Sequence, residues 1–254
     1  MMKNSKLIWI DIGTHFGQEY KSIFSNQTYF AWKLFRRFVG SKVFSRGKFL
    51  KISELAELFK NRKALRKNKN IFYFTFIEAN PKIIAMKVYS EANDVFCLAL
   101  GQNKIKKFSV GKLYHVDRNE TSQGNSIYKT KTNVNINNFT TCVIQNPFLF
   151  ATEYKGYLDE LFSNYKIILR LNCEGSEDDI IYALKNCFQE KFKYVFGSLK
   201  DVKTVKGDKA FQKMMSFIQE NELSYVDFSS SVETWPKAFK KINQIINWCY
   251  FYKN

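Results

Sequence analysis

A stretch near the start of the chain combines an acid and two glycines in a pattern typical of nucleotide-like ligand sites. IDIGTHFGQE, residues 10–19, continues an apolar run and contains Asp11, Gly13 and Gly17. If this stretch forms a strand followed by a loop and a helix, Asp11 lies at the end of the strand. Gly13 would then let the backbone come close to the ligand, and Gly17 would let the helix and the strand pack closely. A dinucleotide loop would read G-x-G-x-x-G and hold a pyrophosphate, which Asp11 would repel. S-adenosylmethionine carries a sulfonium and an ammonium instead, so the charge pattern favours this methyl donor over NAD.

A second stretch, FIEANP at residues 76–81, ends an apolar run in Glu78. A carboxylate only accepts hydrogen bonds, so Glu78 could take both ribose hydroxyls of an adenosine. Pro81 would begin a helix where a missing N–H costs little. Such an acid usually follows the glycines by roughly 20 residues; here a long insertion, which the chain can tolerate energetically, delays it. The alternative is that Glu78 is a solvated strand end.

The third stretch, LRLNCEGSEDDI at residues 169–180, places Asn172 and Glu174 after another apolar run. An acidic first helical turn follows. The carboxyl ends of parallel strands meet at one edge of a sheet, so these side chains are expected at the same edge as Asp11. The acids could also be ordinary helix N-terminal charges, with Ser176 as the cap.

The elements that would position these residues alternate between two kinds. Apolar runs typical of strands buried on both faces occur at residues 6–11, 72–80, 94–101, 165–175, 193–199 and 223–229. Helical patterns occupy residues 81–91, 176–189 and 208–221. This alternation predicts an α/β fold with a doubly wound sheet and a ligand at the carboxyl ends of the strands.

Two segments interrupt the alternation. Residues 20–70 are strongly basic, with Glu54 and Glu57 as their only acids, and predict two amphipathic helices around 28–39 and 52–66. Residues 102–164 are polar and rich in Asn, with β-like pieces at 105–116 and 139–145, and are the natural substrate-facing cover. Neither resembles a separate domain, so we expect a single domain over residues 1–254.

Together these motifs resemble those of the FkbM-type S-adenosylmethionine-dependent methyltransferases. DIGTHFGQE resembles their first motif, FIEANP their E-P-N-P segment, LALG at residues 98–101 their A-L-G segment, and LRLNCEGSEDDI their K-I-D-x-E-G-A-E signature. The resemblance covers roughly residues 6–190, in the family's order. It implies a Rossmann-like class I methyltransferase sheet, here with residues 20–70 as a helical basic insertion after the first strand.

The resemblance also implies roles for individual residues. The first motif would hold the methionine end of the donor, Glu78 its ribose and the Ala99–Leu100 pair its adenine, while Asn172 and Glu174 would face the transferred methyl group. The expected donor-binding residues are Asp11, Gly13, Thr14, His15, Phe16, Gly17, Glu78, Ala79, Asn80, Ala99, Leu100 and Asn172. The chain departs from the family pattern in its long insertion and at Ala79, His15 and Asn172, which replace a proline, a small or Asn residue and an acid.

The chemistry implied is O-methylation of a hydroxyl group on a sugar, glycan or small metabolite. Positioning donor and acceptor in a dry pocket can supply most of the catalysis, with a base taking the hydroxyl proton. Glu174 is the first candidate base, with His15 as an alternative and His115 expected at the surface; Asn172 would align the reactants. Asn172 also removes a charge from the site, and we expect no metal.

The overall charge and the cysteine pattern limit which partners and which cellular location the sequence suggests. With 40 Lys and Arg against 23 Asp and Glu, the formal net charge is +17. We expect an acidic or polyanionic surface partner for residues 20–70, with codon bias of an AT-rich genome as the alternative. The five cysteines include no C-x-x-C pair, and no apolar run is long enough to span a bilayer, which predicts a cytoplasmic protein with at most peripheral membrane contact. The oligomeric state stays open.

Two other functions fit parts of the sequence. A nucleic-acid methyltransferase could track phosphates with the basic, aromatic residues 20–70, but no N/D-P-P-Y motif or recognised RNA-binding module is present. A catalytically silent protein of the donor-binding fold would account for Asn172, because a fold does not guarantee a function.

Overall fold

The computed structural model describes residues 6–25, 27–42, 49–101, 107–116, 121 and 123–251. The described chain divides into two compact units. Unit 1 comprises Met1–Phe16 and Tyr73–Tyr225, and unit 2 comprises Gly17–Phe72 and Val226–Asn254. The expectation of one domain over residues 1–254 stays a prediction.

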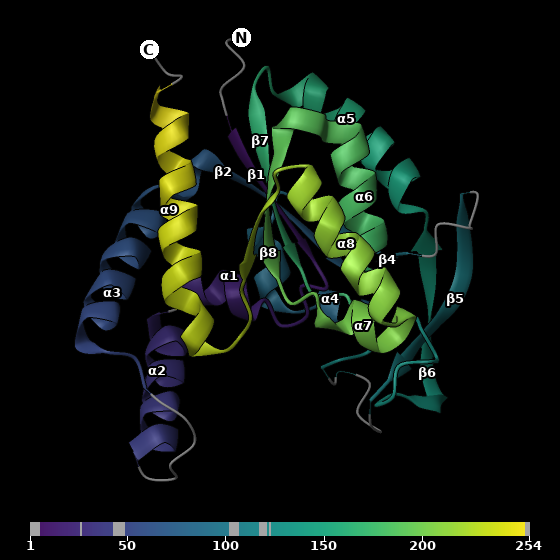
Figure 1. Ribbon diagram of the computed structural model, residues 1–254, viewed down its shortest axis with the longest axis horizontal. Coiled ribbons are helices and arrows are strands. Elements are labelled where there is room, and N and C mark those ends of the chain that lie inside the picture. The colour runs from purple at the N-terminus through teal and green to yellow at the C-terminus, as the bar shows by residue number, and fades with distance from the viewer. Residues whose placement is uncertain are drawn as a thin grey trace. The chain divides into compact units, whose positions relative to one another are not determined.

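Unit 1 is built on a six-stranded sheet of order β3-β2-β1-β7-β8-β9 (Figure 1). The pairs β1·β7, β2·β3 and β7·β8 are parallel. In chain order the six strands read 3-2-1-4-5-6, so the direction of winding reverses between β1 and β7, where α/β proteins bind ligands. The strands are β1 Lys6–Ile12, β2 Phe72–Glu78, β3 Asp94–Cys97, β7 Tyr165–Leu171, β8 Phe192–Gly197 and β9 Ser224–Asp227. The predicted α/β class with a mostly parallel central sheet is confirmed, and it is compatible with a Rossmann-like fold.

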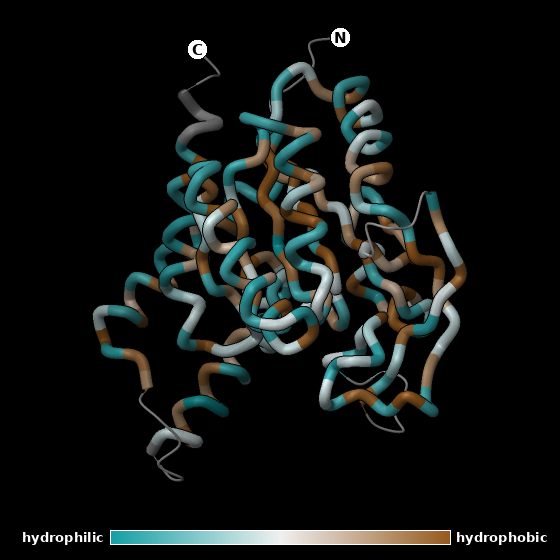
Figure 2. Tube along the Cα trace, turned by 45° about the vertical axis from the view of Figure 1, so that its right-hand side comes forward, coloured by the Kyte–Doolittle hydropathy of each residue, from teal (hydrophilic) through white to brown (hydrophobic). Residues whose placement is uncertain are grey.

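The central strands β1 and β7 consist of mainly apolar residues that are buried on both faces of the sheet. Every residue from Leu7 to Ile12 is buried in β1, and every residue from Ile167 to Leu171 is buried in β7. Figure 2 shows the hydrophobic colour concentrated along these strands. Strands with both faces covered carry such continuous runs rather than an alternation of apolar and polar residues.

Three helices pack on one another over the sheet of unit 1. Figure 1 shows α5, α6 and α8 on one side of it, and α6 contacts both of the others. Their apolar stripes share a core with the strands through residues such as Leu158, Leu184 and Ile218. The helices of this unit are α4 Pro81–Ile84, α5 Pro147–Leu161, α6 Glu177–Phe188, α7 Lys200–Lys206 and α8 Asp208–Glu220.

A second, three-stranded sheet of order β4-β6-β5 belongs to the same unit. It consists of β4 Ala99–Leu100, β5 Phe108–His115 and β6 Asn135–Gln145, and β5 and β6 are antiparallel. The prediction of one strand over residues 94–101 is therefore wrong. β3 pairs with β2 in the large sheet, whereas Ala99 of β4 pairs with Ile144 of β6.

Residues 102–164 contain the two predicted β-like pieces and one helix that was not predicted. β5 and β6 confirm the pieces at 105–116 and 139–145, although residues 102–106 lie outside the described part. The additional helix is α5. It begins where Asn146 accepts hydrogen bonds from the backbone N–H groups of Phe148 and Leu149, with Pro147 in the first turn.

Unit 2 is helical. It contains α1 Gln18–Ile23, α2 Gln27–Lys42, α3 Ile52–Lys67 and α9 Trp235–Phe251, and α3 runs beside α9 (Figure 1). The helices predicted around 28–39 and 52–66 are confirmed as α2 and α3. No helix in the described part of the chain is long and apolar enough to cross a membrane.

A buried arginine organises the core of unit 2. Arg62 of α3 donates from Nε to the Ser22 carbonyl O at 2.7 Å and from Nη2 to the Ser25 carbonyl O at 3.2 Å. Its guanidinium lies 4.2 Å from the centre of the Phe30 ring, which stacks on Trp235. Arg62 thus ties α1 and the loop after it to α2 and α3.

We expect Arg62→Met to lower the free energy of unfolding by about 1–3 kcal/mol, because it leaves the buried Ser22 carbonyl and the partly buried Ser25 carbonyl without these donors. Chemical denaturation followed by circular dichroism measures the effect. Lys63→Met, on the exposed side of the same helix, is the matched control and should change stability by less than about 0.5 kcal/mol. Equal stabilities of the two variants would contradict this role of Arg62.

Candidate functional site

The first predicted motif forms the loop after β1, and its glycine is required by the protein's own backbone. Gly13 has a φ of 72°, and its N–H donates to the carbonyl O of Ile77 at 2.9 Å. A Cβ at Gly13 would lie 2.1 Å from the carbonyl O of Asn172. The loop after β1 therefore meets the end of β2 and the loop after β7 at Gly13, at the switch point of the sheet.

Asp11 is paired with an arginine that the sequence analysis did not single out. Arg170 sits opposite it in the β1·β7 register, and its Nη1 donates to Asp11 Oδ1 at 3.0 Å and to the Gly13 carbonyl O at 2.8 Å. Both side chains are buried. The pair is neutral overall, so the argument that a lone charge on Asp11 would repel a phosphate loses its basis. The one available signal was that Arg170 is the only charged residue in the apolar run IILRL, residues 167–171.

The remaining residues of the first motif are held by local contacts. The Thr14 hydroxyl donates to the Asp11 carbonyl O at 2.8 Å. His15 has a φ of 50°, and its ring lies edge-on to Phe16 with Nε2 2.9 Å from the Thr121 carbonyl O. Gly17, with a φ of 63°, precedes α1. These contacts shape the loop, and its role in donor binding stays a prediction.

Glu78 joins the loop after β1 to the loop after β2. Its Oε2 accepts from the His15 N–H at 2.9 Å and its Oε1 accepts from the Asn80 N–H at 3.0 Å. The residue is 7% exposed, so the alternative of a solvated strand end is wrong. Burial raises its pKa. The Ala79 N–H also contributes a backbone hydrogen bond to this carboxylate. Because a carboxylate has about four acceptor positions, some acceptor capacity remains.

The helix predicted over residues 81–91 begins at Pro81 as expected, but α4 ends at Ile84 and a 3-10 helix follows at Lys87–Glu91. Pro81 occupies its first turn, and Asn80 Oδ1 accepts from the Lys82 N–H at 3.0 Å. Ala79 packs against a small apolar cluster that includes Ala99. Leu100 is also buried, and a Cβ at the next residue, Gly101, would lie 2.5 Å from Ser176 Oγ. The end of β4 is therefore closely packed against the start of α6.

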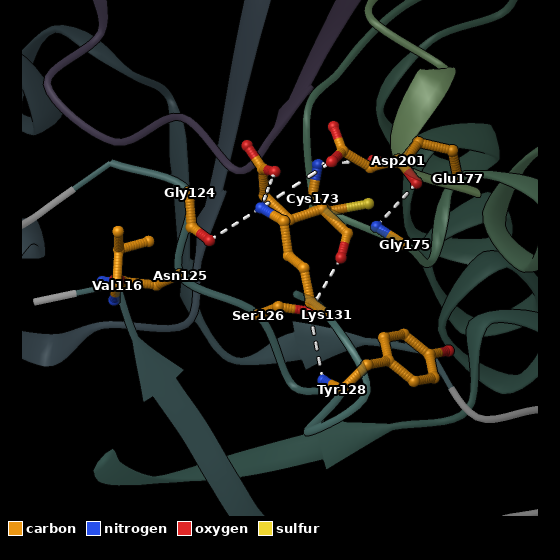
Figure 3. Close-up of polar contacts among 11 residues, drawn as sticks. Val116, Gly124, Asn125, Ser126, Tyr128, Lys131, Cys173, Gly175, Glu177 and Asp201 are labelled. Atoms are coloured by element: carbon orange, nitrogen blue, oxygen red, sulfur yellow. Dashed lines mark hydrogen bonds and ion pairs between the residues drawn. The ribbon is translucent and has the colours of Figure 1, made fainter. Parts of the chain in front are cut away.

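Glu174 lies in an ion-pair cluster centred on Lys131. The ammonium of Lys131 contacts the Glu174 carboxylate, donates to the Gly124 carbonyl O at 2.8 Å and lies 3.7 Å from Asp201 Oδ1 (Figure 3). Burial raises the pKa of Glu174, and the charge of Lys131 opposes this shift. Neither Lys131 nor Asp201 was identified from the sequence, since each lies on a different segment from Glu174.

A second carboxylate, Glu177, fixes the backbone around Glu174. Its Oε1 accepts from the Cys173 N–H at 3.0 Å and its Oε2 accepts from the Gly175 N–H at 2.8 Å (Figure 3). Ser176 occupies the N-cap position of α6 as predicted, but its side chain makes no capping hydrogen bond. The Asn172 N–H donates to the Ile12 carbonyl O at 3.0 Å, which anchors the start of this loop on β1.

Several predicted residues are thus brought together and one is not. Hydrogen bonds and close backbone contacts link Asp11, Gly13, His15, Glu78 and Asn172 at the ends of β1, β2 and β7. His115 instead lies on β5, with its Nε2 2.8 Å from Thr140 Oγ1, and it is completely buried, so the expected surface position is wrong. Among the described residues no group of three or more His, Cys, Asp or Glu side chains is arranged to hold a metal.

We expect Gly13→Ala to lower the free energy of unfolding by about 3 kcal/mol or more, because the methyl group would meet the Asn172 carbonyl in a backbone region that alanine rarely adopts. Gly156→Ala is the matched control. It sits on the exposed face of α5 with no other atom within 4 Å of its Cβ position, so it should be neutral or stabilising by up to about 1 kcal/mol. Thermal and urea unfolding of both variants check this, and comparable changes would refute the backbone constraint.

A pH dependence follows from Glu177, whose pKa burial raises to about 7, with a further rise from the charges of Glu174 and Asp201. The folded protein binds this proton more tightly than the unfolded chain, so the contribution to stability is present at low pH and is lost as pH rises through about 7. We expect Glu177→Gln, which does not titrate, to remove up to about 3 kcal/mol of pH-dependent stability between about pH 5 and 8. Urea denaturation across this range measures it, and identical pH profiles for wild type and variant would contradict it.

Comparisons of the chain with models of protein families, with curated proteins and with solved structures find no match. The order of the strands and the side chains that meet where β1, β2 and β7 end are the features that bear on function. The resemblance to the FkbM-type methyltransferases stays a hypothesis drawn from the motifs.

Proposed function

We propose that the chain is an S-adenosylmethionine-dependent methyltransferase that methylates a hydroxyl group of a sugar, glycan or small metabolite, as the FkbM-type motifs imply. The observation that carries the proposal is the Glu78 carboxylate. It lies at the end of the strand beside β1, is oriented by the His15 and Asn80 amides, and keeps acceptor capacity for ribose hydroxyls beyond its backbone contacts. A nucleoside ribose bound at the switch point of the sheet would supply those hydroxyls.

The other donor contacts follow from this placement. The methionine part of the donor carries both an ammonium and a carboxylate, so the neutral Asp11–Arg170 pair does not oppose it. It would lie against the loop residues Gly13 to Phe16. The adenine would lie toward Ala99 and Leu100, whose apolar side chains suit a flat aromatic ring.

The reaction would be an in-line displacement. The acceptor oxygen forms a bond to the methyl carbon, the carbon–sulfur bond breaks, and its electron pair stays on sulfur as the neutral thioether. The hydroxyl proton goes to a base, for which Glu174 is the candidate. Its burial supports this role, because a raised pKa brings a carboxylate closer to the pKa that general bases need near neutral pH. Lys131 would hold the carboxylate in place.

We expect S-adenosylmethionine to bind and to raise the melting temperature, since a ligand that binds only the folded state stabilises it. Glu78→Gln should weaken binding about tenfold or more, because the amide has one acceptor oxygen instead of two. Calorimetry measures both affinities, and circular dichroism checks the fold. Glu220→Gln on the exposed side of α8 is the control and should bind like wild type. Unchanged affinity in Glu78→Gln would remove the ribose assignment, and a wild type that binds no donor would refute the function.

Measuring the rate of methyl transfer tests whether Glu174 acts as the base. With methyl-labelled donor and a panel of monosaccharides, nucleotide sugars and small alcohols, Glu174→Gln should lower the rate about 10²–10⁴-fold while donor affinity is kept. A chelator should leave the wild-type rate unchanged. Full activity of the variant would transfer the base role to His15 or to solvent.

One observation favours the alternative of a catalytically silent donor-binding protein. The family's acid is Asn172 here, and the carboxylate of Glu174 is already engaged by Lys131. Donor binding at normal affinity with no transfer to any acceptor in the panel would support this alternative over the enzyme.

A further inference from the structure

Helix α2 has a row of aromatic side chains on its exposed face. Trp32 is 49% exposed, Phe35 66% and Phe38 45%. Successive members are three residues apart, so they share one side of the helix. The opposite side is already used, because Phe30 and Leu34 are buried and Phe30 stacks on Trp235 of α9. The exposed row is therefore a second apolar face of α2, which within unit 2 is met at Phe38 by the edge-on ring of Phe49.

Exposed apolar residues are usually scattered singly, and a contiguous group marks a surface that contacts something else. A separate exposed aromatic residue lies on α3, where Phe59 is 52% exposed and packs edge-on against the buried Phe30. Three adjacent aromatic residues on one helix are the kind of apolar face that enters a membrane interface or a partner's groove.

The positive charge of unit 2 indicates the sign of the charge on the partner. The exposed side of α3 is basic, and α2 adds an exposed Arg36; the α3 residues are Lys60, Lys63, Arg66 and Lys67. With a net charge of +17, a second copy of the chain would be repelled rather than attracted. The complementary partner is therefore negatively charged.

The aromatic geometry selects between negatively charged partners. Single-stranded nucleic acid stacks its bases on open aromatic faces. The Arg36 guanidinium lies over the Trp32 ring, 5.3 Å from its centre, and occupies a ring face that a base would need. A lipid interface needs no open ring face; it needs a continuous apolar side flanked by cations whose long side chains reach the headgroups.

We propose that α2 is a membrane-surface anchor that inserts Trp32, Phe35 and Phe38 into the interface of a bilayer containing anionic lipid, with the basic residues of α2 and α3 at its phosphates. The anchor does not depend on the methyltransferase proposal. It gives the chain a surface for acting on, or binding beside, membrane-associated molecules.

Co-sedimentation with lipid vesicles tests the anchor. The wild-type chain should sediment with vesicles of phosphatidylcholine and phosphatidylserine, less with phosphatidylcholine alone, and less as salt rises. Replacing two exposed aromatics together, Trp32→Ser with Phe35→Ser, should lower partitioning about tenfold or more. Phe108→Ser is the matched control, because Phe108 is a 69% exposed aromatic on β5 of unit 1.

Charge is tested separately with Lys60→Glu combined with Lys63→Glu, which should lower binding only to the vesicles that contain phosphatidylserine. Equal partitioning of wild type and the Trp32/Phe35 variant would overturn the anchor, and so would an equal loss in Phe108→Ser. If the wild type binds single-stranded RNA but neither vesicle, the partner is nucleic acid and the proposal is wrong. Pelleting without vesicles, abolished in the Trp32/Phe35 variant, would show self-association through this face and would also overturn it.

Discussion

The buried ion pair between Asp11 and Arg170 is the interaction on which the ligand edge of the large sheet depends. Both charges are removed from water, a loss that only close mutual contact and further hydrogen bonds can offset. Arg170 also donates to the Gly13 carbonyl, while the Gly13 N–H donates to the Ile77 carbonyl of β2 and Gly13 lies close to the backbone of Asn172. The ion pair thus holds the loop after β1, which in turn contacts β2 and the loop after β7, so any ligand at this edge meets a surface that is already ordered.

The strands of the large sheet could be predicted because burial on both faces leaves an unbroken apolar run in the sequence. The same rule failed at residues 94–101, where the run is unbroken but the chain changes partner from β2 to β6. It also failed for α5, because aromatic and Thr residues in PFLFATEY suit a strand as well as a helix, and only Asn146 and Pro147 signal the helix start. Which strand a segment pairs with depends on tertiary structure, and the local amino-acid composition does not reveal it.

The residues of the candidate site also fall into those that the local sequence identifies and those that it does not. Gly13 and Glu78 could be identified because residue type and a position after an apolar run indicate their environment. The sequence does not identify Arg170, Lys131 and Asp201 as site residues, because their roles depend on contacts with residues elsewhere in the chain. Arg170, for example, lies 159 residues from Asp11 in the sequence. Glu177 was visible only as one of three acids in a helix turn, and its two backbone amide contacts separate it from the other two.

The two segments of unit 2 are made at different times during synthesis. Helices α2 and α3 leave the ribosome early, whereas α9, which covers Phe30 through Trp235, is separated from them by the whole second part of unit 1. At typical elongation rates this delay lasts about ten to thirty seconds. During that interval the apolar residues of α2 and α3 lack their final partner, so the nascent chain is a natural client for chaperones that shield hydrophobic helices until the C-terminal segment emerges.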